Sequence, residues 1–327
     1  MRIGIYLDVR NPPPWHRPWP AVYRWTLELA EQAEAWGADS AWTTEHHFFE
    51  DGYLPQPLTL AAALAARTTR MRLGTAVLLA PLRPAVHIAE EAAVVDLISD
   101  GRLDLGLGAG YRTAEFAAYG ADMEARYRTV DAHVRQIRAL LGEGGVTPPP
   151  VQSPLPLWIG YLGPKGARRA GRMGEGLLSL VPGTTEPYLQ GLAEAGHPPS
   201  TARIAGLVYA LVADDPDEAW SVVGPHVAYQ LHSYERHFLE GSGTPASRPA
   251  QPSELRTMGL ASPHPGVFPA FVVVTPGQAV EMLRRYAPSG VRSEAFFFAT
   301  IGGMPDELAA RHVELLCTTV RPAVRDL

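Results

Sequence analysis

The sequence predicts an α/β protein built as a single (β/α)8 TIM barrel. Strand-like and helix-like segments alternate along the chain, eight strand segments can be counted, and 327 residues suffice for one barrel with insertions. The alternation predicts a parallel sheet covered by helices. Eight units fit a closed barrel better than an open sheet, so we expect one domain spanning 1–327.

The first half of the chain contributes four of these strands. Residues 3–8 have the composition of a buried strand, and 22–36 have apolar residues at helical spacing, closed by Gly37. Asp100-Gly101 predicts a turn before the fourth strand. The remaining expected elements are strands at 40–44, 71–79 and 102–107, and helices at 58–67, 85–98 and about 114–141.

The alternation resumes after a loop rich in Gly and Pro at 142–156. The expected elements are strands at 157–160, 176–181, 204–213 and 294–299, and helices at 164–173, 185–195, 216–231, 276–286 and 305–320. The exception is 241–269, a Pro/Gly-rich segment without a convincing period. A structureless loop of this length is usually a lid, a binding loop or a disordered insertion.

Composition narrows the function. Twenty-eight Lys and Arg against 34 Asp and Glu give a formal charge of −6 without a dense basic block, so a small molecule is expected as partner rather than nucleic acid. The single cysteine, Cys317, permits no intrachain disulfide. No apolar run reaches the roughly 20 residues of a membrane helix, and no signal peptide is seen. We therefore expect a soluble, cytoplasmic protein without membrane contact.

A Glu45-His46-His47-Phe48 run directly follows the predicted strand at 40–44. Reactive groups of a parallel barrel sit where strands end, so acid–base chemistry is one interpretation. A metal site is not expected, because successive strand side chains point to opposite faces and further ligands are missing. The alternative is a polar strand end whose imidazoles bind neighbouring backbone.

Two glycine-rich segments end other strands. Gly106 to Gly110 allows close approach of a flat ligand or of another backbone, or merely relieves crowding at the rim. It is not a dinucleotide fingerprint, since Tyr111 takes the place of the third glycine. Gly160 to Gly166 leads into a helix and is a candidate phosphate cradle through its free amides, whereas Arg168 and Arg169 also fit a solvated helix face.

The loop at 11–20 combines five prolines with Trp15 and Trp19. On a TIM barrel this loop borders the mouth of the active site. Its stiff prolines and two indoles could form an apolar wall for a substrate. A packed surface crossover is the alternative.

Taken in order, several motifs resemble the bacterial-luciferase-like flavin-dependent monooxygenases. The motifs are WTTEHHF at 42–48, LGTAV at 73–77, the helix and turn at 87–102, GLGAGY at 106–111 and PLWIG at 156–160. The order of the motifs carries the resemblance, and it covers nearly the entire chain apart from the proline-rich insertion.

The resemblance implies a two-component monooxygenase. It uses reduced FMN (FMNH2) and O2, through a C4a-peroxyflavin, to oxygenate a small organic substrate such as an aldehyde, a ketone or a natural-product intermediate. A separate flavin reductase supplies the FMNH2, and the chain forms a homodimer. His46 matches the family's catalytic histidine, with Glu45 and His47 orienting it or the flavin.

The resemblance also implies a non-prolyl cis peptide at Ala76-Val77 beneath the flavin. Luciferases proper have a cysteine and a phosphate-holding arginine where Gly108 and Ala109 stand here, so Arg112, Arg126, Arg128 or the amides after Gly160 would anchor the phosphate instead. The expected cofactor contacts are Ala76, Val77, Gly108, Ala109, Tyr111, Arg126, Gly160, Tyr161, Leu162 and Gly163.

Two alternatives stay open. A deazaflavin (F420) dependent dehydrogenase or reductase of the same barrel superfamily also shows Gly-x-Gly-Ala-Gly before an aromatic residue. A non-catalytic flavin-binding protein would keep the ligand site and lose the chemistry. The Glu-His-His-Phe run at 45–48 favours FMN and oxygen.

Overall fold

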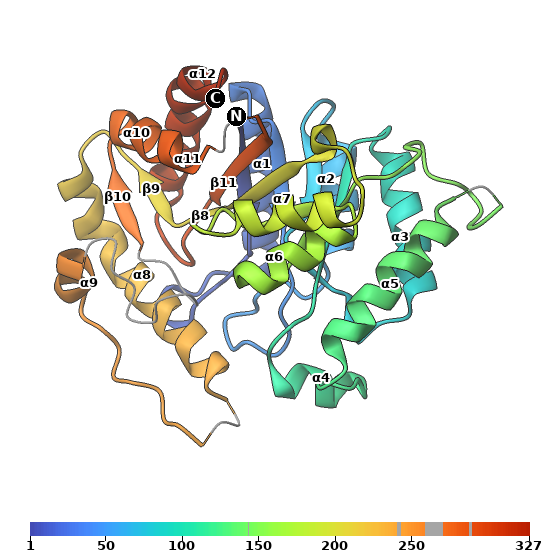
Figure 1. Cartoon of the computed structure of the whole chain (residues 1–327). Helices are drawn as coiled ribbons and strands as arrows, with labels where there is room; N and C mark the ends of the chain where they lie inside the picture. The colour runs from blue at the N-terminus through green and yellow to red at the C-terminus, as the bar shows by residue number, and fades with distance from the viewer. Residues whose placement is uncertain (143, 241–242, 259–270, 288–289) are drawn as a thin grey trace.

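The computed structural model describes residues 1–142, 144–240, 243–258, 271–287 and 290–327. Its strands form a closed parallel barrel in the order β3-β2-β1-β11-β8-β7-β6-β5-β4, with a β3–β5 pairing that closes the ring (Figure 1). β4 continues the line of β3 along β5, so the barrel has eight staves. The predicted TIM barrel is therefore confirmed.

The described elements alternate as expected. The barrel strands are β1 (Arg2–Leu7), β2 (Ser40–Thr43), β3 (Arg72–Thr75), β4 (Leu78–Leu79), β5 (Leu103–Gly108), β6 (Leu157–Gly160), β7 (Gly176–Leu178), β8 (Arg203–Val208) and β11 (Arg292–Phe298). The helices are α1 (Trp19–Trp36), α2 (Pro57–Arg67), α3 (Ala85–Ile98), α4 (Thr113–Tyr119), α5 (Arg126–Leu140), α6 (Gly163–Arg172), α7 (Thr185–Glu194), α8 (Pro216–Phe238), α9 (Pro252–Met258), α10 (Pro276–Tyr286), α11 (Asp306–Leu315) and α12 (Arg321–Val324).

Three predicted elements are wrong because each is two elements. The strand expected at 71–79 is interrupted at Ala76-Val77, between β3 and β4. The helix expected at 114–141 breaks after α4, where Gly120 adopts the left-handed conformation, φ 65°, that ends helices. The strand expected at 204–213 ends at Val208. The next strand, β9 (Ala210–Val212), leaves the barrel to pair with β10 (Val272–Val274).

The proline-rich segment at 241–269 is not wholly structureless, because α9 lies within it. Residues 241–242 and 259–270 of this prediction lie outside the described part of the chain. The preceding helix, α8, runs to Phe238 rather than ending near residue 231. Val227, Gln230, Tyr234 and His237 recur at helical spacing on its buried face, which explains the extra turns.

Large rings fill the barrel interior and require glycine on the facing strands. A Cβ on Gly74 would lie 2.2 Å from the Trp42 ring, and one on Gly176 would lie 2.3 Å from the Trp158 ring. Trp42 also stacks on Phe296 with 5.1 Å between ring centroids. These glycines therefore give the indoles room to pack across the barrel.

Parallel strands give the barrel two different mouths. Both chain termini lie at the top of Figure 1, at the end where the strands begin, and α4 lies at the lower edge, beyond the end where they finish. The loops that follow the strands therefore gather at the lower mouth. Among the described helices, none has the length and apolar character needed to span a membrane.

Candidate functional site

The Glu45-His46-His47 run leaves β2 at the carboxyl end of the barrel and is buried. Nδ1 of His46 lies 2.9 Å from Oε1 of Glu115 on α4, and the backbone N–H of His47 donates to the same oxygen at 2.8 Å. A carboxylate can only accept, so Nδ1 of His46 carries the proton. Glu115 thus fixes both the ring of His46 and the turn that follows it.

His47 faces a different carboxylate. Its Nε2 lies 2.8 Å from Oε1 of Glu45, and the Tyr119 hydroxyl lies 3.2 Å from its Nδ1. Arg83 forms an ion pair with Glu45 at 2.5 Å, and the Leu79 N–H donates to Glu45 at 2.7 Å. Burial opposes ionisation of Glu45, but the hydrogen bond from His47 and the charge of Arg83 outweigh it, and the pKa of Glu45 lies below its usual value.

The two imidazoles therefore do not converge on one point. Each is held by its own carboxylate, Glu115 for His46 and Glu45 for His47. In the part of the chain that the structure describes, no group of three or more His, Cys, Asp or Glu side chains is arranged to hold a metal ion. The arrangement instead suits proton transfer at His46, whose Nε2 has no hydrogen-bond partner among the described residues.

Aromatic rings surround His46. Its ring centroid lies 5.0 Å from that of Phe49, 4.9 Å from that of Tyr53 and 5.1 Å from that of Tyr111. His237 of α8 stacks on Phe49, with 3.7 Å between the ring centroids. The C-terminal turns of α8 therefore close one side of the site, which keeps His46 in apolar surroundings with little access for water.

A polar cluster lies where β1 ends, beside these rings. Arg10 is fully buried and donates through Nε to Asp51 at 2.6 Å and through Nη2 to Ser233 at 2.6 Å. Asp8 is equally buried, and neither of its carboxyl oxygens has a partner in the described residues. Burial raises the pKa of Asp8 to about 7, although the charge of Arg10 opposes the shift.

The peptide bond between Ala76 and Val77 is cis, as the family resemblance implies. The glycines beside it have a packing role. A Cβ on Gly108 would lie 2.3 Å from the Val77 side chain, and one on Gly160 would lie 2.4 Å from it. Both glycines therefore make room for Val77 in the barrel wall, which is the crowding-relief interpretation of the glycine-rich strand ends.

The turn after β6 lies against the start of α5. Tyr161 packs on Tyr127 with 5.5 Å between ring centroids, and its hydroxyl donates to Asp131 at 2.8 Å. Arg169 is bound to the same Asp131, through Nε at 2.7 Å. This network holds the Gly160–Gly163 turn beside Arg126, the first residue of α5.

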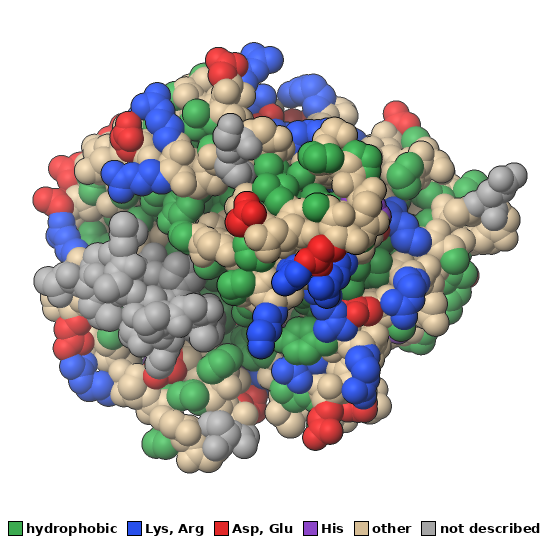
Figure 2. Space-filling model, in the orientation of Figure 1, with side chains coloured by type: hydrophobic (Ala, Val, Ile, Leu, Met, Phe, Trp, Pro, Cys, Tyr) green, Lys and Arg blue, Asp and Glu red, His purple; other side chains and the backbone are tan. Residues whose placement is uncertain are grey.

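The arginines proposed for phosphate binding differ in their surroundings. Arg168 of α6 pairs with Glu194 on the surface. Figure 2 shows Lys and Arg side chains gathered over α6. Arg112 is committed to the His47 carbonyl and to Glu240. Arg126, in contrast, has a buried Nε without a partner in the described chain. A buried donor without a partner indicates a missing acceptor, so the surroundings of Arg126 favour it for phosphate binding.

The two tryptophans of the first loop are engaged in packing. Trp15 lies 3.9 Å from the His226 ring of α8 and covers Gly303. Trp19 covers Gly52, where a Cβ would lie 2.1 Å from its ring. Trp15 is thereby partly buried, whereas Trp19 is still 39% exposed, so these contacts fit both interpretations of the loop.

Besides atoms of the Asp8, Arg10 and Asp51 cluster, three buried polar atoms near the mouth lack partners among the described residues: the Tyr111 hydroxyl, Oε2 of Glu115 and Nε of Arg126. Orphaned buried groups cost free energy and so indicate a missing polar partner. Their positions, beside His46 and beside the Gly160–Gly163 turn, fit a ligand with both a polar ring and a phosphate.

Sequence patterns missed Glu115, Arg83 and the aromatic lining from α8. Glu115 is 69 residues from His46, and a single glutamate in a helical segment carries no local signal of this contact. Its position one turn after the glycine-rich end of β5 is the one clue the sequence offers.

A family model described as luciferase-like monooxygenase matches residues 1–293 of the chain. The chain is 31% identical to the alkanal monooxygenase alpha chain of Photorhabdus luminescens over 44% of its own length. It is 36% identical to the oxygenase component of the flavin-dependent trigonelline monooxygenase of Acinetobacter baylyi over 32%. It is 32% identical to the F420-dependent glucose-6-phosphate dehydrogenase of Amycolatopsis mediterranei over 52%. The alignments span 39%, 29% and 57% of these relatives, respectively.

Solved structures resemble the whole chain. The monooxygenase RslO1 from Streptomyces bottropensis superimposes with a TM-score of 0.78 at 25% identity, covering 98% of this chain and 99% of that one. The oxygenating constituent of 3,6-diketocamphane monooxygenase from Pseudomonas putida, in complex with FMN, superimposes with a TM-score of 0.73 at 17% identity, covering 98% of each chain. The second likeness is one of fold alone.

The buried Asp8 carboxyl predicts a specific pH dependence of stability. Its folded pKa of about 7 lies above the usual value of 3.8, so the unfolded chain ionises first as pH rises. Asp8→Asn should therefore match the wild type near pH 4 and exceed its free energy of unfolding by on the order of 4 kcal/mol above pH 7. Urea unfolding at a series of pH values measures the difference.

The exposed carboxylate variant Glu124→Gln is the control for that series and should show no such rise. A difference between Asp8→Asn and wild type that stays constant from pH 4 to pH 8 would contradict the assignment.

Proposed function

Because the chain belongs to the luciferase-like monooxygenase family, we propose that it is the oxygenase of a two-component system. It takes reduced FMN from a separate flavin reductase and uses O2 to oxygenate a small organic substrate. The observation that carries the proposal is His46, held by Glu115 at the mouth of the barrel with Nε2 left for chemistry. Two of the three named curated relatives are monooxygenases.

The residues at the mouth fit reduced FMN. The ring would lie against the cis peptide at Ala76-Val77, within reach of the Tyr111 hydroxyl, and the phosphate would bind the amides of the Gly160–Gly163 turn and Nε of Arg126. Bound there, reduced FMN supplies the electrons that activate O2. The protein supplies orientation, exclusion of water and control of protons.

His46 is proposed to move a proton at Nε2. Glu115 accepts from Nδ1 and keeps the proton of the neutral ring there, so Nε2 is the nitrogen with the free lone pair. His47 and Glu45 hold the turn in place through Arg83. The aromatic surroundings of His46 keep stray water away from that nitrogen.

The substrate class follows from the same lining. The rings around His46 come from Phe49, Tyr53 and Tyr111, and Phe238 packs against Tyr111 with 5.8 Å between centroids. Such a lining suits an apolar or aromatic organic molecule with one reactive polar group, including aldehydes and ketones. A charged sugar phosphate would find few partners on these rings.

F420-dependent dehydrogenation is the second candidate. It is favoured by the F420-dependent glucose-6-phosphate dehydrogenase relative, whose alignment covers 52% of this chain.

A non-catalytic flavin-binding protein is the third candidate. The held His46 argues against that loss of chemistry, because a binding-only site has no use for a free Nε2 on a fixed imidazole.

We also propose that two chains pair through α3. Val86, Val94, Leu97 and Ile98 of this helix are 40–47% exposed, and three of them follow one another at helical spacing. A cluster of exposed aliphatic side chains on one helix marks an interface.

Anaerobic titration decides between the two cofactors. We expect reduced FMN to bind at least about tenfold more tightly than reduced F420, because Nε of Arg126 and the Gly160–Gly163 amides suit the terminal phosphate monoester of FMN better than the phosphodiester of F420. Quenching of protein fluorescence measures both affinities. Preference for reduced F420 would support the dehydrogenase, and tight FMN binding with immediate H2O2 release on addition of O2 would support the binding-only protein.

Variants of the histidine pair test the proton role. The rate of H2O2 release from the complex of enzyme, reduced FMN and O2 should vary with pH in the wild type and lose that dependence in His46→Ala. Glu115→Ala should also change the profile, because the side chain that holds the His46 ring through Nδ1 is removed. Stopped-flow spectroscopy measures both profiles.

The control for these variants is His197→Ala, on the loop after α7, which should leave the profile unchanged. Full pH dependence in His46→Ala, with reduced FMN still bound, would remove His46 from the proposal.

Light scattering tests the pairing. The wild type should have the mass of two chains at micromolar concentration, and Val94→Glu should have the mass of one, since a buried unpaired charge is costly. Val222→Glu, at an exposed valine on α8, is the matched control. A wild type with the mass of one chain would exclude the α3 pair.

A further inference from the structure

Four barrel strands begin with arginine: Arg2 in β1, Arg72 in β3, Arg203 in β8 and Arg292 in β11. Because all the strands are parallel, their first residues meet at one end of the barrel, opposite the His46 site. Four guanidinium groups therefore gather at this mouth, two of them in ion pairs, Arg2 with Glu294 and Arg72 with Asp104.

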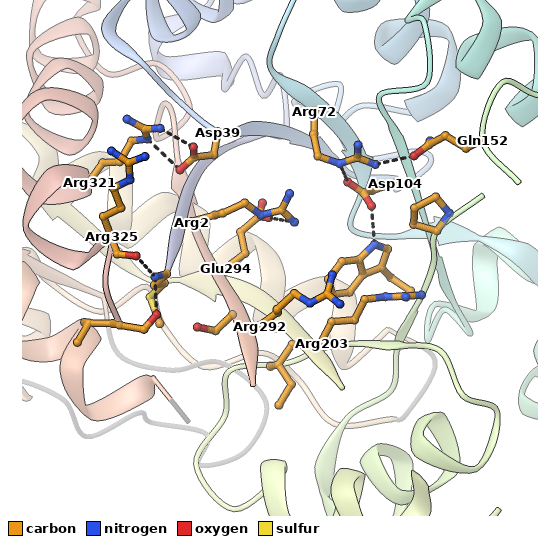
Figure 3. Close-up of a pocket in the computed structure, with 16 residues that line it drawn as sticks. Arg2, Asp39, Arg72, Asp104, Gln152, Arg203, Arg292, Glu294, Arg321 and Arg325 are labelled. Carbon is orange, nitrogen blue, oxygen red and sulfur yellow. Dashed lines mark hydrogen bonds and ion pairs between the residues drawn. The ribbon is translucent and has the colours of Figure 1, made fainter. Parts of the chain in front are cut away.

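These arginines line a cavity of about 660 Å³ at the amino end of the barrel (Figure 3). Arg321 and Arg325 from the C-terminal segment add to the lining, which contains six arginines against three acidic side chains. The cavity is therefore more basic than the chain as a whole, which carries a formal charge of −6. A concave site with this charge selects small anions.

Each acidic side chain of the lining already has an arginine partner. Arg72 binds Asp104 at 2.5 Å, Arg2 binds Glu294 at 2.6 Å and Arg321 binds Asp39 at 2.8 Å. Figure 3 shows these pairs along the wall of the cavity. The lining therefore has no acidic group left for its remaining arginines, Arg203, Arg292 and Arg325.

Arg203 is incompletely satisfied. Its Nη2 donates to the Leu157 carbonyl at 2.8 Å and lies 3.4 Å from Glu175, but Glu175 is already bound by Arg138 through Nε at 2.6 Å. Nε of Arg203 is buried and has no partner among the described residues. Burial lowers the pKa of Arg203, which shows that its charge is undersolvated.

Arg292 lies directly opposite Arg203 in the pairing of β11 with β8. Like charges at paired strand positions repel each other. Arg292 is exposed, and its only hydrogen bond in the described chain reaches the Ser200 carbonyl at 3.5 Å. In Figure 3 both side chains extend along the same side of the cavity. An anion between them would replace this repulsion with two charge-assisted contacts.

We propose that this cavity binds a phosphate group, either free or carried by a small ester, between Arg203 and Arg292. The forked donors of arginine match the oxygens of phosphate, and the cavity volume leaves room for an organic substituent. The site is distinct from the proposed flavin site, because it lies at the opposite mouth of the barrel. Bound phosphate would bridge the first residues of β8 and β11 and so stabilise the fold.

Calorimetric titration tests the proposal at fixed ionic strength with chloride as the reference ion. The probes are inorganic phosphate and glycerol phosphate, each titrated into the protein with and without saturating FMN. Because the proposed flavin site also accepts phosphate, binding that persists with FMN present belongs to the second site. Tighter binding of the ester than of free phosphate would identify an ester as the ligand, and the reverse would identify phosphate itself.

Arg292→Gln should weaken this FMN-resistant binding at least about tenfold, whereas Arg284→Gln, an exposed arginine on α10, should leave it unchanged. Arg292 is exposed, so its variant is expected to fold, and its thermal midpoint without phosphate verifies this. The proposal is overturned if FMN abolishes all phosphate binding, if Arg292→Gln binds as well as wild type, or if about 10 mM of either probe gives no heat.

Discussion

One carboxylate determines the geometry of the candidate site. Glu115 binds both Nδ1 of His46 and the backbone N–H of His47, so it fixes the imidazole and the turn after β2 together. The same turn places Glu45 where Arg83 and the Leu79 N–H bind it. Because Glu115 is fully buried, its two hydrogen bonds are not exchanged for water, and loss of either would leave a polar group unsatisfied.

The two mouths of the barrel are charged differently although the same strands build both. At the carboxyl end, Asp8, Asp51 and Arg10 are buried among aromatic rings beside His46. At the amino end, arginines begin four strands and outnumber the acidic groups. Indole rings that pack over glycines, such as Trp42 over Gly74, fill the interior between the two ends. This packed layer separates the proposed redox site from the proposed phosphate site.

Much of the fold could be predicted, because strand and helix periods are local properties of the sequence. The eight staves, the cis peptide between Ala76 and Val77 and the position of His46 at a strand end all follow from local motifs or family resemblance. The errors came where one apolar stretch contains two elements, as at Gly120. The role of the glycine-rich strand ends became clear only from the structure, because Val77 rather than a ligand occupies the space beside Gly108 and Gly160.

The site was predictable only in part, since its partners are distant in sequence. Glu115, Tyr111 and His237 reach His46 or its neighbours from other parts of the chain, and no spacing rule connects them with His46. The arginines at the strand starts are visible in the sequence, but their meaning depends on parallel closure of the barrel, which brings the first residues of distant strands together.

The central claim is that the carboxyl mouth around His46 holds reduced FMN. A crystal structure of the protein grown anaerobically with reduced FMN tests it most directly. We expect density for the isoalloxazine ring between His46 and the peptide at 76–77, with the phosphate beside Arg126 and the turn at 160–163. A flavin bound elsewhere, or an empty mouth in crystals saturated with reduced FMN, would contradict it.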